Sequence, residues 1–209
     1  MPSAGWLSRH WLAGYLTEGL SSTVTIAATD WDHPSVAAWP APVRHQLRAL
    51  WVSQRRVLAA ARASERTLCH LDVWPANLID DGTRSVLLDW AFTGAGALGE
   101  DPANLILDSL ADGLMDAALL PEVTQGVTDG YLAGLRDGGW AGSADAVRAA
   151  IAACGAAKYS WFAPAVIRSA VRDDVGSSSY RAATSAAALV ERLTPVVTLI
   201  ARWAAAVLS

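Results

Sequence analysis

Lysine is almost missing from this chain of 209 residues. Its 16 Lys and Arg residues comprise 15 arginines and the single lysine Lys158. Cysteine is nearly as scarce, with only Cys69 and Cys154. Two cysteines in a chain of this length do not make a disulfide framework. Because free cysteine is readily buried, we expect two reduced, partly buried thiols.

Long hydrophobic runs are also missing. No run reaches the roughly 18 apolar residues that a membrane span requires. The best candidate, 193–201, contains Pro195 and has an arginine on either side. Arg9, His10 and Glu18 interrupt the N-terminal region, which excludes a signal peptide there. We therefore expect a soluble, cytoplasmic protein with no membrane partner.

The bulk composition indicates one folded domain. Hydrophobic residues make up 53% of the chain, too many for a disordered protein. The length suffices for one domain with its own core, covering 1–209. The formal net charge of −4 argues against nucleic acid as a partner.

Apolar spacing predicts a largely helical chain. In 42–63, Leu47, Leu50 and Leu58 recur at helical spacing, and Pro42 suits a first helical turn. Other predicted helices cover 6–17, 101–118, 121–136, 143–162 with Ser143 as N-cap, and 180–206 with a break at Pro195. The polar segments 19–41 and 172–179 are expected to be connections.

One small β region interrupts the helices. Strands are predicted at 67–70, 76–80 and 84–89, and the Asp-Gly pair between the last two is a strong hairpin signal. Gly94, Gly96 and Gly99 predict an irregular loop after the hairpin. The expected fold class is therefore α+β, mostly helical, with helix packing carrying the core.

The predicted β region also holds the residues that suggest chemistry. His70, Asp72 and Asn77 fit the pattern H-x-D-x-x-x-x-N, and Asp89 and Trp90 follow the hairpin. The loop lets the first carboxylate and the amide point into one cleft, and the hairpin returns the second carboxylate beside the amide. Mg²⁺ prefers such hard oxygen ligands. Phosphoryl transfer needs little more than a base and a held metal ion.

This pattern resembles the catalytic loop and metal-binding Asp of the protein-kinase-like superfamily. Asp89-Trp90 replaces the Asp-Phe-Gly of protein kinases, and together with 99–105 it looks like the aminoglycoside phosphotransferase and choline kinase branch. The resemblance implies that Asp72 is the catalytic base and that His70 braces the loop. It implies a cofactor site of Asn77, Asp89 and Trp90, with Asn77 and Asp89 as Mg²⁺ ligands and ATP or GTP as co-substrate.

The resemblance also implies a protein-kinase-like C-terminal lobe divided into 1–66, 67–100 and 101–209. These parts are N-terminal helices and linker, the catalytic loop with the metal-binding hairpin, and a helical subdomain. The family's N-lobe has no counterpart here, because no glycine-rich loop and no lysine precede His70. Three explanations stay open: a truncated or misassigned start, a degenerate gene fragment, or a site completed by another chain. A homodimer, or a partner covering the bare face, is the corresponding expectation.

Acidic residues gather after the hairpin. From Ser85 to Leu135 there are eight acids and no Lys, Arg or His. Asp108, Asp112 and Asp116 recur every four residues, which predicts one acidic helix face. With Asp101 they are candidates for binding a polycationic substrate such as an aminoglycoside. The alternatives are a solvated face and, for Asp101, a charge favoured by the helix dipole.

Two functions follow as hypotheses. The first is an ATP- or GTP-dependent phosphotransferase whose acceptor is a hydroxyl of a small molecule. The acceptor is cationic if the acidic helix face binds it. An aminoglycoside-like antibiotic, and hence antibiotic resistance, is one such case. The second is a catalytically incomplete, pseudokinase-like binding or scaffolding module.

Overall fold

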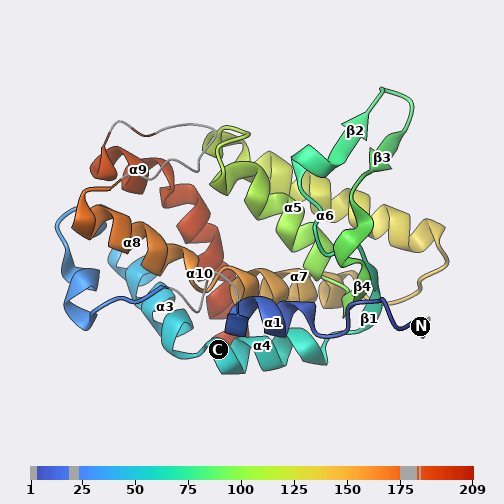
Figure 1. The fold of residues 1–209 in the computed structure, drawn as a ribbon, viewed down its shortest axis with the longest axis horizontal. Coiled ribbons are helices and arrows are strands. Elements are labelled where there is room, and N and C mark those ends of the chain that lie inside the picture. Colours follow the sequence, from blue (N-terminus) through green and yellow to red (C-terminus); the bar gives the residue numbers. More distant parts are fainter. Residues whose placement is uncertain (1–3, 19–23, 175–182, 184) are drawn as a thin grey trace.

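The computed structural model describes residues 4–18, 24–174, 183 and 185–209, and it shows a mostly helical chain with two small antiparallel sheets (Figure 1). The α+β class predicted from the sequence is therefore confirmed. The predicted helix start at 180, and parts of the predicted connections 19–41 and 172–179, lie outside the described residues.

The helical elements follow the predicted order but not all the predicted bounds. They are α1 (Trp11–Glu18), η1 (Ala28–Asp32), η2 (Val36–Ala38), α3 (Ala41–Val52), α4 (Gln54–Ala63), η3 (Pro75–Asn77), η4 (Trp90–Phe92), α5 (Glu100–Ala111), η5 (Ala117–Leu119), α6 (Leu120–Asp137), α7 (Ala144–Lys158), α8 (Phe162–Arg172), α9 (Ala186–Arg192) and α10 (Thr194–Leu208).

Several of these bounds differ from the predicted ones, and the helix expected at 6–17 begins only at Trp11. The single helix expected at 42–63 is divided at Ser53, which ends α3 and begins α4. The helix expected at 143–162 ends at Lys158, and the one expected at 101–118 ends at Ala111. The chain does break near Pro195, as predicted, because this proline lies in the first turn of α10.

The β region forms two separate ladders. Strand β2 (Leu78–Asp80) pairs with β3 (Ser85–Leu87) in the expected hairpin. Its turn uses Gly82 at φ +82°, a backbone conformation that favours glycine. Strand β1 (Arg66–Cys69) pairs with β4 (Gly94–Ala97), so the loop expected at 94–99 is wrong over its first four residues. Gly96 suits this ladder because a Cβ there would lie 2.7 Å from the sulfur of Cys69.

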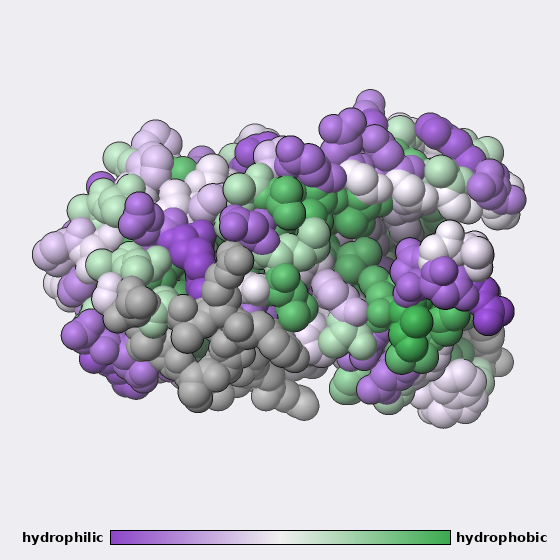
Figure 2. Space-filling model, turned by 90° about the horizontal axis from the view of Figure 1, so that it is seen from above, coloured by the Kyte–Doolittle hydropathy of each residue, from purple (hydrophilic) through white to green (hydrophobic). Residues whose placement is uncertain are grey.

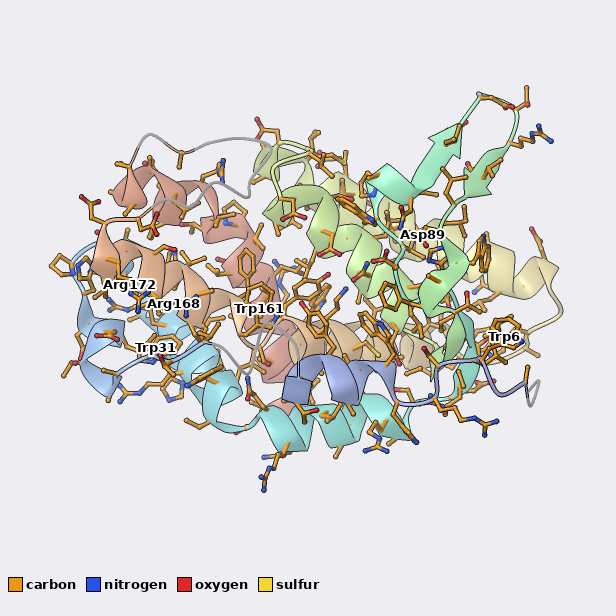
Figure 3. The ribbon with its side chains drawn as sticks, in the orientation of Figure 1. Trp6, Trp31, Asp89, Trp161, Arg168 and Arg172 are labelled. Carbon is orange, nitrogen blue, oxygen red and sulfur yellow. The ribbon has the colours of Figure 1, made fainter. Side chains whose placement is uncertain are left out.

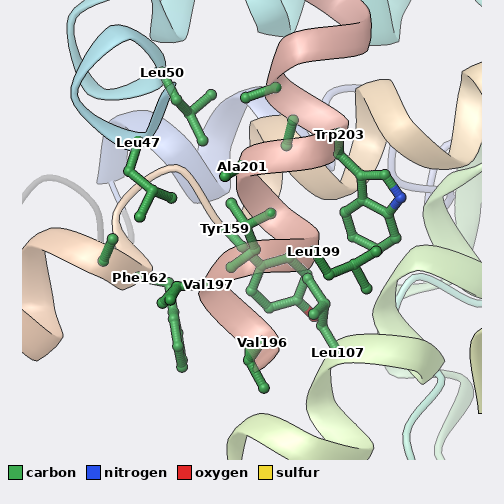
Figure 4. Close-up of a cluster of buried hydrophobic side chains, with 14 of the residues drawn as sticks. Leu47, Leu50, Leu107, Tyr159, Phe162, Val196, Val197, Leu199, Ala201 and Trp203 are labelled. Carbon is green, nitrogen blue, oxygen red and sulfur yellow. The ribbon is translucent and has the colours of Figure 1, made fainter. Parts of the chain in front are cut away.

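The core is organised around α7. This helix is buried over most of its length and packs against α4, α5 and α10. Its many alanines allow close approach, and Gly155 leaves room for the ring of Trp203 in α10. Figure 4 shows side chains from several elements meeting around α10. The labelled residues are Leu47, Leu50, Leu107, Tyr159, Phe162, Val196, Val197, Leu199, Ala201 and Trp203.

Among the described residues, the stretch Ala144–Arg172, which comprises α7 and α8, is long and apolar enough by length and composition to cross a membrane. However, 89% of its most apolar window is buried inside the protein. A core helix of a folded domain meets the same test, and the position of α7 at the centre of the helix packing agrees with that interpretation (Figure 1).

Candidate active site

The predicted site residues come from three short segments around the β2–β3 hairpin. Asp72 lies in the loop after β1, and Asn77 ends η3 directly before β2. The backbone N–H of Leu88 donates to the carbonyl of Asn77 at 2.9 Å. This bond joins the two ends of the hairpin and brings Asp89 back to Asn77. Figure 3 shows Asp89 at the base of the hairpin.

Asp72 and Asn77 are in direct contact. The side-chain amide of Asn77 donates to the carboxylate of Asp72 at 2.9 Å and to its backbone carbonyl at 3.0 Å. Both side chains are half-buried. Because the amide nitrogen is committed to Asp72, the amide oxygen is the atom that Asn77 can offer to a metal ion.

Asp89 has a left-handed backbone, with φ 54° and ψ 71°. This conformation is uncommon for residues other than glycine. One carboxylate oxygen accepts from the N–H of Ala91 at 3.4 Å, and the residue is exposed. Asp89 therefore presents a solvent-accessible carboxylate at the base of the hairpin (Figure 3).

His70 connects the loop after β1 to the hairpin. It is buried, and its Nε2 lies 2.7 Å from the carbonyl of Leu88. Its Nδ1 accepts from the backbone N–H of Asp72 at 3.3 Å. These contacts assign the proton to Nε2. The ring of Trp90 packs edge-on against the imidazole, with 4.7 Å between ring centroids, while 52% of Trp90 stays exposed.

Asp101 holds the same loop from α5. Its two carboxylate oxygens accept from the backbone N–H groups of His70 and Leu71, each at 2.8 Å. Leu71 has φ 69°, a strained conformation that these bonds help to hold. Burial raises the pKa of Asp101, and the two N–H bonds partly offset that shift.

The structure gives Asp101, a candidate for substrate binding, a role in holding the loop. Both carboxylate oxygens are taken by the loop, and the side chain is more than a charge at a helix N-terminus. No local pattern in the sequence points to this contact, because the two partners are 30 and 31 residues apart.

Asn104 is a further loop-positioning residue that sequence reasoning missed. It is buried in α5, and its amide donates to the carbonyl of Val73 at 2.7 Å. The hydroxyl of Tyr159 lies 3.1 Å from the amide oxygen of Asn104 and 2.6 Å from a carboxylate oxygen of Asp108. Asp108 is therefore part of an internal network that reaches the residue next to Asp72.

The predicted acidic helix face is wrong. Helix α5 ends at Ala111, so Asp112 is its C-cap and Asp116 lies beyond it. Asp116 instead caps η5 by accepting from the N–H of Ala118 at 3.0 Å. Asp108 pairs with Lys158, whose ammonium nitrogen lies 3.6 Å from it. The four-residue spacing fails as a signal because the helix stops one residue before the second aspartate.

The residue types at the two ends of the hairpin are those expected of a magnesium site. Among the described residues, no three His, Cys, Asp or Glu side chains form a metal-binding group. The expected ligands are one amide and one carboxylate, with water and phosphate oxygens completing the shell. Asn77 and Asp89 supply that pair from the two ends of the hairpin.

Apolar side chains remain exposed beside these polar groups. Ile79 and Val86 are opposite each other in the hairpin and are 53% and 39% exposed. Leu88 shares their face because side chains alternate along a strand, and it is 39% exposed. Figure 2 shows hydrophobic surface on the hairpin side of the molecule. The site therefore combines an apolar platform with two carboxylates and an amide.

Comparison with known proteins identifies the family. A family model described as the phosphotransferase enzyme family matches residues 15–144, which include the loop, the hairpin and α5. No curated protein and no solved structure matches the chain. The matched region covers more than half of the 209 residues. The chain belongs to the phosphotransferase enzyme family.

Proposed function

We propose that this chain carries the catalytic and metal-binding residues that transfer the γ-phosphoryl group of ATP or GTP to a hydroxyl of a small molecule. The observation that carries the proposal is the hydrogen bond between Asn77 and Asp72, at 2.9 Å. It supports the proposal because the residues proposed as base and metal ligand are in direct contact, and Asp89, the second proposed ligand, follows the hairpin.

Asp72 is the proposed base. Its carboxylate would accept the proton of the acceptor hydroxyl as that oxygen attacks the γ-phosphorus. The amide of Asn77 and the N–H bond to His70 fix its position. Asn77 and Asp89 would hold Mg²⁺, which neutralises charge on the phosphates when bound. The proposed role of His70 is to brace the loop.

The exposed hairpin face is the proposed nucleotide platform. Ile79 and Val86 offer apolar surface next to Asn77, and Trp90 adds an exposed ring beside Asp89. A flat base packs well on such surface, while the phosphates reach the polar groups at the base of the hairpin. Lys158, the only lysine in the sequence, is buried against Asp108 and is not placed to bind the nucleotide.

The acceptor is proposed as a small molecule with a free hydroxyl group. A cationic, aminoglycoside-like acceptor was favoured by an acidic helix face that does not form. Asp101 binds the catalytic loop and Asp108 binds Lys158. Both carboxylates are engaged by these internal partners, and the antibiotic-resistance hypothesis loses its main sequence argument.

The described residues before β1 form only helices and short turns, with one isolated bridge from Ser8 to Gly94. They include no glycine-rich loop that could cover the phosphates. We therefore propose that this chain corresponds to the C-terminal lobe of the family's enzymes and that phosphate-covering groups come from elsewhere.

A partner-dependent or pseudokinase-like module is the second candidate, favoured by the apolar exposure of Ile79, Val86, Leu88, Trp90 and Phe92. Such a patch can pair with another chain, including a second copy. Size-exclusion chromatography with light scattering would support this candidate by showing a dimer. A monomer that turns over nucleotide would count against it.

The direct test of the phosphotransferase proposal is nucleotide turnover. Purified protein would be incubated with Mg²⁺, ATP or GTP, and a panel of neutral, anionic and cationic alcohols. Acceptor-dependent release of the nucleoside diphosphate, lost in Asp72→Asn, would support the proposal. Turnover that the Asp72→Asn variant retains would refute the assigned base.

A further inference from the structure

Lys158 lies in an unusual place for the only lysine of the chain. It ends α7, and its side chain is 10% exposed. A buried ammonium is costly unless it is paired. Burial lowers its pKa, whereas the carboxylates of Asp108 and Asp72 raise it. The structure must therefore supply compensating contacts.

Three aromatic rings and one carboxylate surround the ammonium. Its nitrogen lies 5.1 Å from the ring centroid of Trp11, 5.4 Å from that of Tyr15 and 5.3 Å from that of Tyr159. Asp108 contributes the carboxylate oxygen at 3.6 Å. Aromatic faces attract cations within about 6 Å of the ring centroid. We call these four residues the ammonium box.

The ammonium box is assembled from three helices and is braced internally. Trp11 and Tyr15 come from α1 and stack at a centroid distance of 5.2 Å. Asp108 comes from α5, and Tyr159 follows α7 and holds Asp108 through its hydroxyl at 2.6 Å. The residues of the ammonium box are therefore held by contacts with one another as well as by contacts with the lysine.

The box adjoins the proposed catalytic loop. Tyr159 and Asn104 connect it to the carbonyl of Val73, the residue after Asp72. Asp108 is 22% exposed in its side chain, and Trp11 and Tyr15 are half-buried. A carboxylate and aromatic faces at a partly open position near the base are the groups that would recognise a cationic acceptor. In this chain a lysine of the same molecule already fills that position.

We propose that Trp11, Tyr15, Tyr159 and Asp108 form an ammonium-binding site whose resident ligand is Lys158. This internal ligand excludes cationic groups from the site and makes Lys158 a specificity-determining residue for the acceptor. The specificity role of Lys158 rests on the proposed phosphotransferase function. The ammonium-binding site stands without that function, because the box is defined by contacts that need no nucleotide.

The first experiment uses the unmodified sequence. Since Lys158 is the only lysine, labelling with ε-¹⁵N-lysine gives a single side-chain ammonium signal in the NMR spectrum. The proposal predicts slow hydrogen exchange of that signal and upfield-shifted neighbouring methylene protons, caused by the three rings. Exchange and shifts equal to those of free lysine would overturn the box.

The second experiment empties the box. Lys158→Ala keeps Cβ, so propylammonium replaces the missing atoms, and binding is followed by tryptophan fluorescence and calorimetry. We expect saturable binding of propylammonium to this variant, at least about tenfold tighter than binding of uncharged 1-propanol. The wild type and Lys158→Met, in which the box is filled or blocked, should show no saturable binding.

Three outcomes would overturn the proposal. They are equal binding of propylammonium and 1-propanol, no binding by a folded Lys158→Ala variant, and saturable binding by the wild type. Adding Asp108→Asn to Lys158→Ala should weaken propylammonium binding. If Lys158→Ala does not fold, the NMR experiment on the wild type decides. None of these measurements needs turnover, so their failure would leave the phosphotransferase proposal untouched.

Discussion

The side-chain amide of Asn77 donates a hydrogen bond to the carboxylate of Asp72, with 2.9 Å between Nδ2 and Oδ2. This contact orients the carboxylate and leaves the amide oxygen for a cation. It also predicts that the two residues act as a unit, so that changing either one disturbs the other.

Asp72→Asn is expected to abolish most turnover without unfolding the protein. The new amide oxygen can still accept from Asn77, but it cannot take up the proton of the acceptor hydroxyl. General-base catalysis contributes typically about 10²–10⁴-fold, and the loss should be of that order. The measurement is nucleoside diphosphate release, with circular dichroism as the fold control. Turnover within a few-fold of the wild type would contradict the role of Asp72.

Asp101→Asn tests whether α5 holds the catalytic loop. An asparagine offers one oxygen where two backbone N–H groups, of His70 and Leu71, need acceptors. The unsatisfied N–H group should cost about 1–3 kcal/mol in the free energy of unfolding. Urea denaturation measures this loss. Asp129→Asn, at an exposed position of α6, is the matched control and should change stability by less than about 0.5 kcal/mol.

Two glycine substitutions should have opposite effects on stability. In Gly99→Ala, the new Cβ would collide with the backbone of Ala150 and Ile151, which forces α5 and α7 apart. Overpacking of this kind costs about 1–3 kcal/mol or more. In Gly126→Ala, the Cβ on α6 would meet nothing within 4 Å, so better helix propensity should stabilise by about 0.5–1 kcal/mol. Thermal unfolding of both variants, compared with wild type, measures whether each substitution lowers or raises stability.

Stability should fall in alkaline solution. Burial raises the pKa of the Cys69 and Cys154 thiols above 9.0, raises the pKa of Tyr15 from 10.0 to about 12, and raises that of Tyr159 as well. Such groups contribute stability that is complete below their unfolded pKa and is lost as pH rises toward the folded pKa. Lys158 acts in the opposite direction. Its pKa is lowered in the folded state, so its contribution to stability increases as pH rises.

Because these thiols and tyrosines, together with Tyr131, whose pKa burial also raises, outweigh one lysine, we expect the urea midpoint to fall between pH 8 and pH 11. Cys154→Ala should flatten this decline. A flat midpoint over the same range would show that these groups ionise as readily in the folded protein as in the unfolded chain, and an increase would show that the lowered pKa of Lys158 dominates.

The catalytic loop and hairpin could be predicted from the sequence because their information is local. His70, Asp72, Asn77 and Asp89 lie on short segments, and a two-strand hairpin with an Asp-Gly turn allows few arrangements. The contact between Asp72 and Asn77 follows from a five-residue separation. The roles proposed for these residues remain predictions for the experiments above.

The supports of the loop could not be predicted in the same way. Asp101 and Asn104 reach it from α5 across about 30 residues, and that contact depends on how the helix docks. The prediction of an acidic helix face was wrong because the spacing of the aspartates cannot show where α5 ends. Likewise, the apolar spacing of 42–63 continues through the break at Ser53, and the Gly-Ala repeat of β4 lacks the alternation that signals a strand.

The two ends of the hairpin are proposed to hold a metal-bound nucleotide. Calorimetric titration of the purified chain with Mg²⁺ and ATP or GTP tests this proposal most directly, with Asp89→Asn as the matched variant. Asp89 is exposed, so its replacement should spare the fold, which circular dichroism checks. We predict Mg²⁺-dependent nucleotide binding by the wild type that the variant loses by at least about tenfold. Equal binding by both proteins, or binding that does not depend on Mg²⁺, would contradict the proposed site.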